Sequence, residues 1–308
     1  MDWSTRRAEH RTTDHRGSAD RECRLLPYSD RVVVRSAVQV EARPNPALRP
    51  YVTSYVGFEL SGFPPGIHLG TPGRSLTVIV SLSEPLDVVD VDGATPRSGQ
   101  FGAVAGGLTS RSVAIRHDGN QHGIRLSLTP LGARAIFGMP SAALAHDLVH
   151  LDDVLGRVGA ELVDRIRGAE TWPERFVTLD AVLARVARRR SVSTQAGHPI
   201  RPEVEEAWRR LVGHRGRVQI GSLAADLGWS RRHLGDHFRK EIGLTPKEVA
   251  RILRFERAHE LATTANPQSW AHVSAAAGYA DQAHLVRDWR EFTGCAPTTW
   301  RRSEVLPA

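Results

Sequence analysis

The last third of the chain contains an internal repeat, and this repeat constrains the fold more than any other feature. Residues 223–228 (Leu-Ala-Ala-Asp-Leu-Gly) align with 273–278 (Val-Ser-Ala-Ala-Ala-Gly) at an offset of 50 residues. Residues 230–234 (Ser-Arg-Arg-His-Leu) align with 281–285 (Asp-Gln-Ala-His-Leu) at an offset of 51. Such self-similarity indicates one supersecondary unit that occurs twice.

Each copy has the signals of two helices joined by a tight turn. A glycine at 228 or 278 ends the first helix, Ser230 or Asp281 is placed to cap the second, and a glycine at 243 or 294 follows it. Ala224 and Ser274 are small where the two helices should cross. This is the plan of a helix-turn-helix, so we expect the last hundred residues to be helical.

A longer helix is expected between the two copies. Thr245, Pro246 and Glu248 form the pattern of a capping box with proline at the first helical position. The helix should end by 265–267, and about 16 residues at 1.5 Å each give a rod of roughly 24 Å. Such a rod could hold two recognition helices about one turn of DNA, ~34 Å, apart.

The residues that define this pattern are Leu223, Ala224, Gly228, Trp229, Ser230, His233, Leu234, Phe238, Gly243, Pro246, Gly278, Tyr279, Asp281, Gln282, His284, Leu285, Arg287, Gly294, Pro297, Trp300 and Arg301. With them, residues of about 200–302 resemble the tandem helix-turn-helix domain of the AraC/XylS family of bacterial transcription regulators. Trp270, Ser274 and Leu285 depart from the residues that are usual in the family at these positions.

The resemblance implies several partners. Double-stranded promoter DNA would bind the C-terminal domain, and RNA polymerase would be a partner if the protein is an activator. The family also implies a cupin-like N-terminal β-domain that binds a small-molecule effector, followed by helices used to form a homodimer.

Helical periodicity predicts which side chains of each second helix face outward. Leu234 and Phe238 in the first copy, like Leu285 and Trp289 in the second, should be buried. Arginine pairs well with guanine, and glutamine with adenine. The expected base contacts are Arg231, Arg232, Asp236, Gln282 and Arg287, and the expected phosphate contacts are Arg239 and Arg290.

Some of these side chains have a second interpretation. Asp236 could accept a hydrogen bond from cytosine or orient a neighbouring arginine. His233 and His284 could pack within the domain or contact phosphate. The tryptophans at 208, 229, 270, 289 and 300 could stack on single-stranded bases, but their helical spacing favours the core.

The first two thirds of the chain have a different residue pattern. Short segments rich in Val, Ile and Leu alternate with Gly, Pro and Asp, which predicts an antiparallel barrel or sandwich. The expected strands are 31–40, 51–60, 76–82, 86–91, 112–116 and 123–129. From residue 132 the period becomes helical, with one apolar stripe over 151–166 and another over 176–186.

The expected fold class is therefore α+β with two domains. A flexible tail (1–30) precedes a β-rich sensor or dimerisation domain with a helical tail (31–187), which is a cupin-like barrel or sandwich. A linker (188–199) leads to the all-α tandem helix-turn-helix domain (200–303). Charge divides in the same place: residues 1–187 carry 21 basic and 21 acidic side chains, whereas 188–303 carry 20 and 12, which favours a polyanion at the C-terminal part.

No residue set for catalysis or metal binding is evident. His117 and His122 lack the spacing of cupin metal ligands, and there is no phosphate-binding glycine loop or nucleophile elbow. We expect no catalytic residue, cofactor or metal. His68, Glu59 and Arg74 could line a pocket, but no effector-binding residue is assigned. Strand-sized apolar runs and a polar first thirty residues favour a cytoplasmic protein without membrane contact.

These observations predict a sequence-specific DNA-binding transcription regulator that is not an enzyme. An effector on the N-terminal domain would shift the population of dimer geometries. Two alternatives stay open. One is an architectural protein that binds DNA with little sequence preference, and the other, less favoured, is a cupin-like enzyme fused to a DNA-binding domain.

Overall fold

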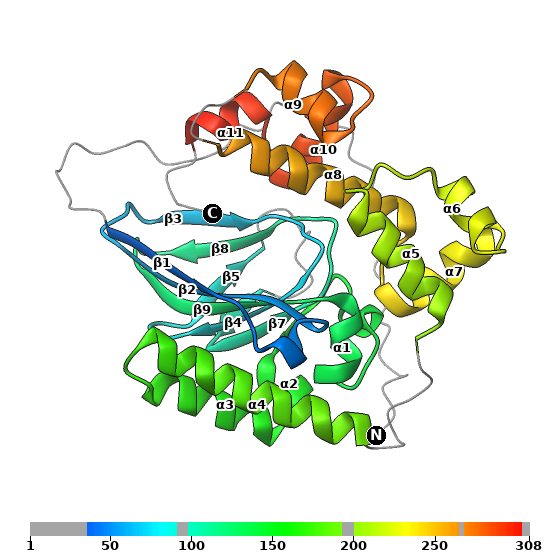
Figure 1. Cartoon of the computed structure of the whole chain (residues 1–308). Helices are drawn as coiled ribbons and strands as arrows, with labels where there is room; N and C mark the ends of the chain where they lie inside the picture. Colours follow the sequence, from blue (N-terminus) through cyan, green and yellow to red (C-terminus); the bar gives the residue numbers. More distant parts are fainter. Residues whose placement is uncertain (1–35, 91–97, 193–199, 265–267, 304–308) are drawn as a thin grey trace, which may run out of the picture.

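The computed structural model describes residues 36–90, 98–192, 200–264 and 268–303. The expected tail at 1–30, the start of the first expected strand and most of the expected linker lie outside them. The described residues form a β-rich domain with helices on one side and a helical C-terminal region on the other (Figure 1). None of the helices in these ranges is long and apolar enough to cross a membrane.

Two antiparallel sheets build the β-rich domain. The six-stranded sheet has the order β1-β2-β9-β4-β7-β10, and the four-stranded sheet has the order β3-β8-β5-β6. Over the described ranges both sheets stay open, so the fold is a sandwich rather than the closed barrel that the sequence also allowed. The strands are β1 Ser36–Ala42, β2 Val52–Ser61, β3 Gly66–Gly70, β4 Leu76–Ser81, β5 Leu86–Val89, β6 Gly99–Phe101, β7 Ala103–Gly106, β8 Val113–His117, β9 Gln121–Leu128 and β10 Leu148–His150.

Four strands are not predicted by the sequence, namely β3, β6, β7 and β10. They are three to five residues long, and three of them contain glycine. Their conformation comes from pairing with distant segments: Gly106 lies opposite both Thr77 and Leu148. A Cβ on Gly106 would lie 2.9 Å from the end of the Leu148 side chain, so any larger residue there would displace that side chain.

Helices cover the face of the six-stranded sheet that points away from the four-stranded one (Figure 1). They are α1 Pro130–Ile136, α2 Leu151–Leu155, α3 Arg157–Gly168 and α4 Trp172–Val192, with short 3-10 turns at Pro46–Leu48 (η1) and Ser141–Leu144 (η2). The apolar stripe at 151–166 is divided between α2 and α3, because Gly156 between them has φ 58°. Leu179 and Leu183 of α4 join the core that this sheet forms.

Helix α4 corrects one predicted boundary. It continues to Val192, so residues 188–192, which were assigned to the linker, are helical. The physical reason is that residues 186–192 contain neither glycine nor proline, and the breakers come only at Gly197 and Pro199.

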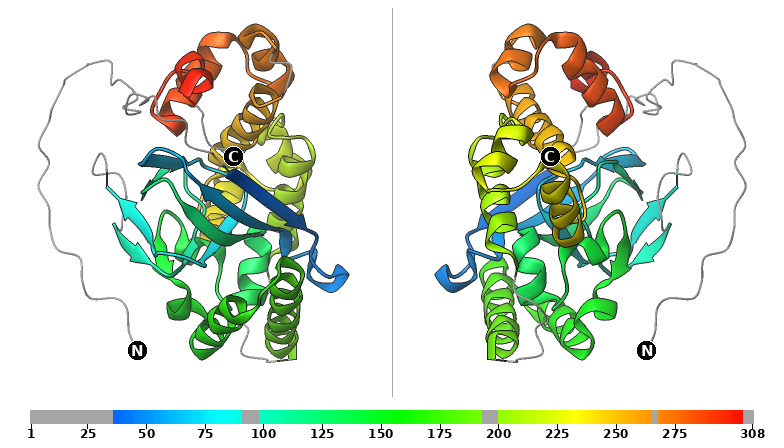
Figure 2. Two further views of the ribbon diagram at one scale, coloured as in Figure 1. Left: turned by 90° about the vertical axis from the view of Figure 1, so that its left-hand side faces the viewer. Right: turned by 90° about the vertical axis from the view of Figure 1, so that its right-hand side faces the viewer.

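The C-terminal region is all-helical, as predicted. Its helices are α5 Pro202–Gly213, α6 Ile220–Asp226, α7 Arg231–Ile242, α8 Pro246–Ala262, α9 Trp270–Ala277, α10 Gln282–Thr293 and α11 Pro297–Ser303. The two copies of the repeat are α6–α7 and α9–α10, and α8 runs between them (Figure 2). The predicted capping box is present, with the Thr245 side chain and the Glu248 side chain each accepting from the other's backbone N–H.

The two parts of the chain touch at defined points. Arg134 of α1 donates two hydrogen bonds, of 2.6 and 2.7 Å, to the carboxylate of Glu241 near the end of α7. Directly after α7, Gly243 packs on Ala142 and Ala145 at η2. The C-terminal end of α7 therefore rests on the β-rich domain.

Candidate functional site

The first helix-turn-helix is built as its sequence signals predict. Gly228 takes φ 72° in the turn, and the Ser230 hydroxyl accepts a hydrogen bond of 3.2 Å from the His233 backbone N–H. Leu234 and Phe238 are completely buried. Because these two side chains fix the rotation of α7, the opposite face of the helix points to solvent.

The second helix-turn-helix repeats this construction. Gly278 has φ 85°, and a carboxylate oxygen of Asp281 accepts a hydrogen bond of 2.7 Å from the His284 backbone N–H. Leu285 and Trp289 are completely buried. This turn has two residues, Tyr279 and Ala280, where the first copy has Trp229 alone, and Tyr279 packs edge-on against the His284 ring at 5.1 Å.

All seven side chains that were predicted to contact DNA are exposed. They are Arg231, Arg232, Asp236 and Arg239 on α7 and Gln282, Arg287 and Arg290 on α10. On α10, Gln282, Arg287 and Arg290 line one hollow in the surface together with Ala283 and Val286. The outward face of α10 thus presents one glutamine and two arginines beside two small apolar residues.

Most arginines of these two faces have no ionic partner. Within the described ranges, the side chains of Arg231, Arg239, Arg287 and Arg290 make no ion pair and no hydrogen bond. Arg232 is 93% exposed, and its guanidinium lies 4.0 Å from the Asp236 carboxylate. That contact is the one required if Asp236 orients a neighbouring arginine.

Other arginines of the domain are used for structure. Arg209 and Arg210 both bond to Glu206. These hydrogen bonds lower the pKa of Glu206 to about 2. The contrast between paired arginines on α5 and unpaired arginines on α7 and α10 separates the structural cations from those available to a ligand.

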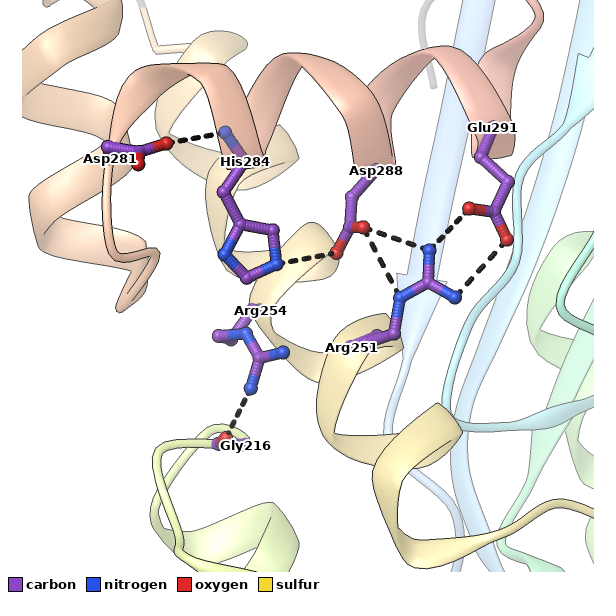
Figure 3. Close-up of polar contacts among 7 residues, drawn as sticks. All are labelled: Gly216, Arg251, Arg254, Asp281, His284, Asp288 and Glu291. Atoms are coloured by element: carbon purple, nitrogen blue, oxygen red, sulfur yellow. Dashed lines mark hydrogen bonds and ion pairs between the residues drawn. The ribbon is translucent and has the colours of Figure 1, made fainter.

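Helix α8 holds α10 through a buried ionic network (Figure 3). The Arg251 guanidinium donates to one oxygen of Asp288 at 2.9 and 3.2 Å and to Glu291 at 2.5 and 3.2 Å. These contacts, those of Glu291 first, raise the pKa of Arg251 above its usual value. The other oxygen of Asp288 lies 3.8 Å from His284 Nε2. The network fixes the rotation of α10.

The same helix also contacts the turn that leads from α5 into the first copy. Arg254 donates a hydrogen bond of 2.9 Å to the backbone carbonyl of Gly216, in the turn that follows α5 (Figure 3).

The His233 ring packs edge-on against Trp229 at 4.6 Å. Both repeat histidines thus pack on an aromatic residue of their own turn. Trp208 and Trp289 are core residues, whereas Trp229, Trp270 and Trp300 are partly buried.

A second candidate site is a cavity of about 400 Å³ between the two sheets. Its walls come from both sheets, and one side is formed by Phe255, Glu256, His259 and Glu260 of α8. Of the three residues suggested for a pocket, Arg74 lines the cavity, and His68 and Glu59 are not among its lining residues.

At the α8 side of the cavity, Glu256 joins the two parts of the chain. Its carboxylate accepts a hydrogen bond of 2.8 Å from the Arg74 backbone N–H and lies 3.7 Å from the Arg74 side chain. Burial raises the pKa of Glu256. This contact therefore forms part of the cavity wall.

Sequence reasoning missed Arg125, which lines the cavity from β9. The available signal was an arginine at an alternating position within an apolar strand. The ranges that the structure describes contain no group of three or more His, Cys, Asp or Glu residues placed to hold a metal ion.

Comparison with known proteins gives one family match. A family model described as a helix-turn-helix domain matches residues 223–303, which include both copies of the repeat. No curated protein matches the chain.

Several solved structures are similar to parts of the chain. ToxT from Vibrio cholerae, solved with an unsaturated fatty acid bound, aligns with 87% of this chain and 100% of its own at 10% identity, with a TM-score of 0.47. The C-terminal domain of AraT, a response regulator from Geobacillus stearothermophilus, aligns with 36% of this chain and 92% of its own at 20% identity and a TM-score of 0.33. A probable AraC family regulator from Rhodopseudomonas palustris aligns with 35% of this chain and 100% of its own at 25% identity and a TM-score of 0.30. On the family match and the duplicated motif, residues 223–303 are an AraC-type helix-turn-helix domain.

Proposed function

We propose that this protein is a transcription regulator that binds double-stranded DNA in a sequence-specific manner. The observation that carries the proposal is the pair of exposed helix faces on α7 and α10. Apart from Arg232, which lies near Asp236, their arginines make no ion pair or hydrogen bond with the described residues, and a buried pair of side chains lies on the opposite face of each helix. Guanidinium groups that are free to bond suit the phosphates and the guanine edges of a major groove.

The side chains divide into two roles by their place on the helices. Arg231, Arg232, Gln282 and Arg287 lie in the first half of each recognition helix, which is the part that reaches base edges in this motif. Asp236 would orient Arg232. Arg239 and Arg290 lie one or two turns further on and would contact phosphates.

Helix α8 supports a tandem arrangement of these contacts. Its 17 residues give a rod of about 26 Å at 1.5 Å per residue. The ionic network at Asp288 attaches the second copy to it, and the bond from Arg254 attaches the turn that leads into the first copy. Two helices on one such rod suit successive major grooves, about 34 Å apart.

A small molecule is proposed to control this binding from the cavity between the sheets. The cavity is lined by α8, so its occupant would contact the same helix that carries both recognition helices. Binding there would favour one position of α8 on the β-rich domain and shift the population of DNA-competent states. We assign the protein no enzymatic role.

Selection of genomic fragments by the purified full chain, followed by footprinting, tests the DNA proposal. At about 150 mM salt we expect one asymmetric site of about 17–20 base pairs that covers two adjacent major grooves. The matched variants are Arg287→Ala, which removes an unpaired arginine from α10, and Arg209→Ala, which removes an exposed arginine from α5. Only the first should change the selected sequence.

The selection also decides between the proposal and the architectural alternative. An architectural protein would protect scrambled duplexes as well as selected ones, because its affinity comes from phosphate contacts alone. Equal protection of both duplexes would contradict sequence-specific regulation.

A further inference from the structure

The inner face of the six-stranded sheet has an unusual composition. Along β4 and β9, one face carries Leu and Val residues that pack on the helices and are fully buried. The other face, towards the four-stranded sheet, carries Thr77, Ile79, Arg125 and Ser127, paired in register as Thr77 with Ser127 and Ile79 with Arg125. The space between sandwiched sheets is normally filled by apolar side chains. Here three of these four positions are polar.

Arg125 is the charged member of this face, and the described residues leave it without a partner. Its guanidinium makes no ion pair and no hydrogen bond with them, and its Nε atom is buried and unsatisfied. The carboxylate that acts on it electrostatically is that of Glu41 on β1, which is separated from β9 by the whole width of β2. Burial lowers the pKa of Arg125.

The neighbouring titratable group does not compensate this charge. His68 on the four-stranded sheet interacts with Arg125, and burial together with the charges of His117 and Arg125 lowers the pKa of His68 to about 4. The imidazole is therefore neutral near pH 7. A half-buried cation without a counter-ion is unfavourable, so an anion that reached Arg125 would gain a charged hydrogen bond.

Besides Arg125, the cavity has both polar and apolar walls, because Thr77, Ser127, Glu256 and Glu260 also line it. Val88, Val104, Ile115 and Leu148 line it, and its volume of about 400 Å³ is in the range of sites for small organic ligands, about 300–1,000 Å³. A polyphosphate would need more cations than Arg125 and, at the mouth, Arg74.

We propose that Arg125 is the anion-binding group of this cavity, and that the cavity takes an organic acid with one carboxylate or sulfonate and an apolar body. The acid group would lie against the guanidinium, and the body would lie along the apolar walls formed by Val88, Val104, Ile115 and Leu148. Identifying this acid with the effector rests on the proposed function. The anion site itself depends only on the cavity and Arg125.

Two fluorescent probes test the site directly. Anilinonaphthalene sulfonate is an aromatic body with one sulfonate, and phenylnaphthylamine is the same body without it. We expect the full chain to prefer the sulfonate, and Arg125→Met to weaken sulfonate binding by about 10- to 100-fold, the effect of a charged hydrogen bond, with phenylnaphthylamine unchanged. Arg125→Lys should keep part of the preference.

The control variant is Arg116→Met. Arg116 lies in the same domain, but its side chain is 63% exposed outside the cavity, where it pairs with Asp87. This variant removes the same charge and should bind both probes as the parent does. Equal sulfonate binding by Arg125→Met and the parent would overturn the proposal. So would loss of both probes together with a fall in melting temperature, because Arg125 would then be structural.

The same preparations separate this inference from the proposed function. DNA binding is measured on the selected duplex with no probe present, and we expect the parent and Arg125→Met to bind it alike. Sequence-specific DNA binding without an Arg125-dependent preference for the sulfonate would refute the anion site alone. An Arg125-dependent preference in a chain that selects no DNA sequence would refute the regulator and leave the anion site standing.

Discussion

The buried network between α8 and α10 gives a quantitative prediction. Arg251 donates two hydrogen bonds to one oxygen of Asp288, whose side chain is 4% exposed, whereas its other partner, Glu291, is 50% exposed. Removing Arg251 would leave a buried carboxylate whose remaining contact is His284 at 3.8 Å. Breaking one side of such a pair is strongly destabilising, whereas the exposed arm to Glu291 contributes less than about 1 kcal/mol.

From these contacts we expect Arg251→Met to lower the free energy of unfolding by about 3 kcal/mol, Asp288→Asn by about 2, and the double variant by about 3. The single effects exceed the double effect by a coupling energy of about 2 kcal/mol. Arg257→Met is the matched control, because Arg257 lies on the same helix and pairs with the exposed Glu260. It should cost less than about 1 kcal/mol.

The assay is urea unfolding of the full chain followed by tryptophan fluorescence. Five of the seven tryptophans lie between residues 208 and 300, so the signal reports mainly on the C-terminal region. Additive single effects, with a coupling below about 0.5 kcal/mol, would refute the argument that the pair positions α10.

Three further predictions concern DNA contacts and pH. Arg287→Ala should weaken binding to the selected site by about 1–3 kcal/mol and relax one base position, measured by competition with single-base variants. Arg239→Ala should make the slope of the logarithm of the binding constant against the logarithm of the salt concentration shallower by about one, with the preferred sequence unchanged. Titration at several salt concentrations measures this slope. Because the pKa of His68 falls from 6.5 to about 4 on folding, the unfolded chain takes up its proton first as the pH drops. The contribution of neutral His68 to the free energy of unfolding is therefore fully present above pH 6.5. It is lost as the pH falls towards 4, by at most about 3 kcal/mol. In urea unfolding, the free energy of unfolding of His68→Gln should fall less than that of the parent between pH 6.5 and 4. The exposed control His272→Gln should behave like the parent.

Each of these three has a distinct contrary result. Arg287 is not a base contact if its removal weakens every duplex equally. Arg239 is not a phosphate contact if its removal changes which base is preferred. His68 is not the source of the pH dependence if His68→Gln and the parent lose the same stability between pH 6.5 and 4.

In the C-terminal region, signals within single helices and turns were sufficient to predict the fold. The caps at Ser230 and Asp281, the glycines of the turns and the buried pairs four residues apart act within one helix or one turn. The identity of neighbouring residues therefore determined both helix-turn-helix units and the outward face of each recognition helix. Which arginines of the domain would be paired was not predictable, because Glu206 and Asp288 meet their partners only in the folded chain.

In the β-rich domain, only part of the structure could be predicted from local sequence. Long alternating segments such as β4 and β9 were predictable, whereas β6, β7 and β10 are short and exist because distant strands pair with them. Alternation along β9 determined that Arg125 and Leu126 lie on opposite faces, and by itself it placed the arginine on a face that water could cover. Whether other parts of the chain cover this face is decided only by the tertiary structure. The four-stranded sheet and α8 cover part of that face, so the partial burial of Arg125 depends on segments far away in the sequence.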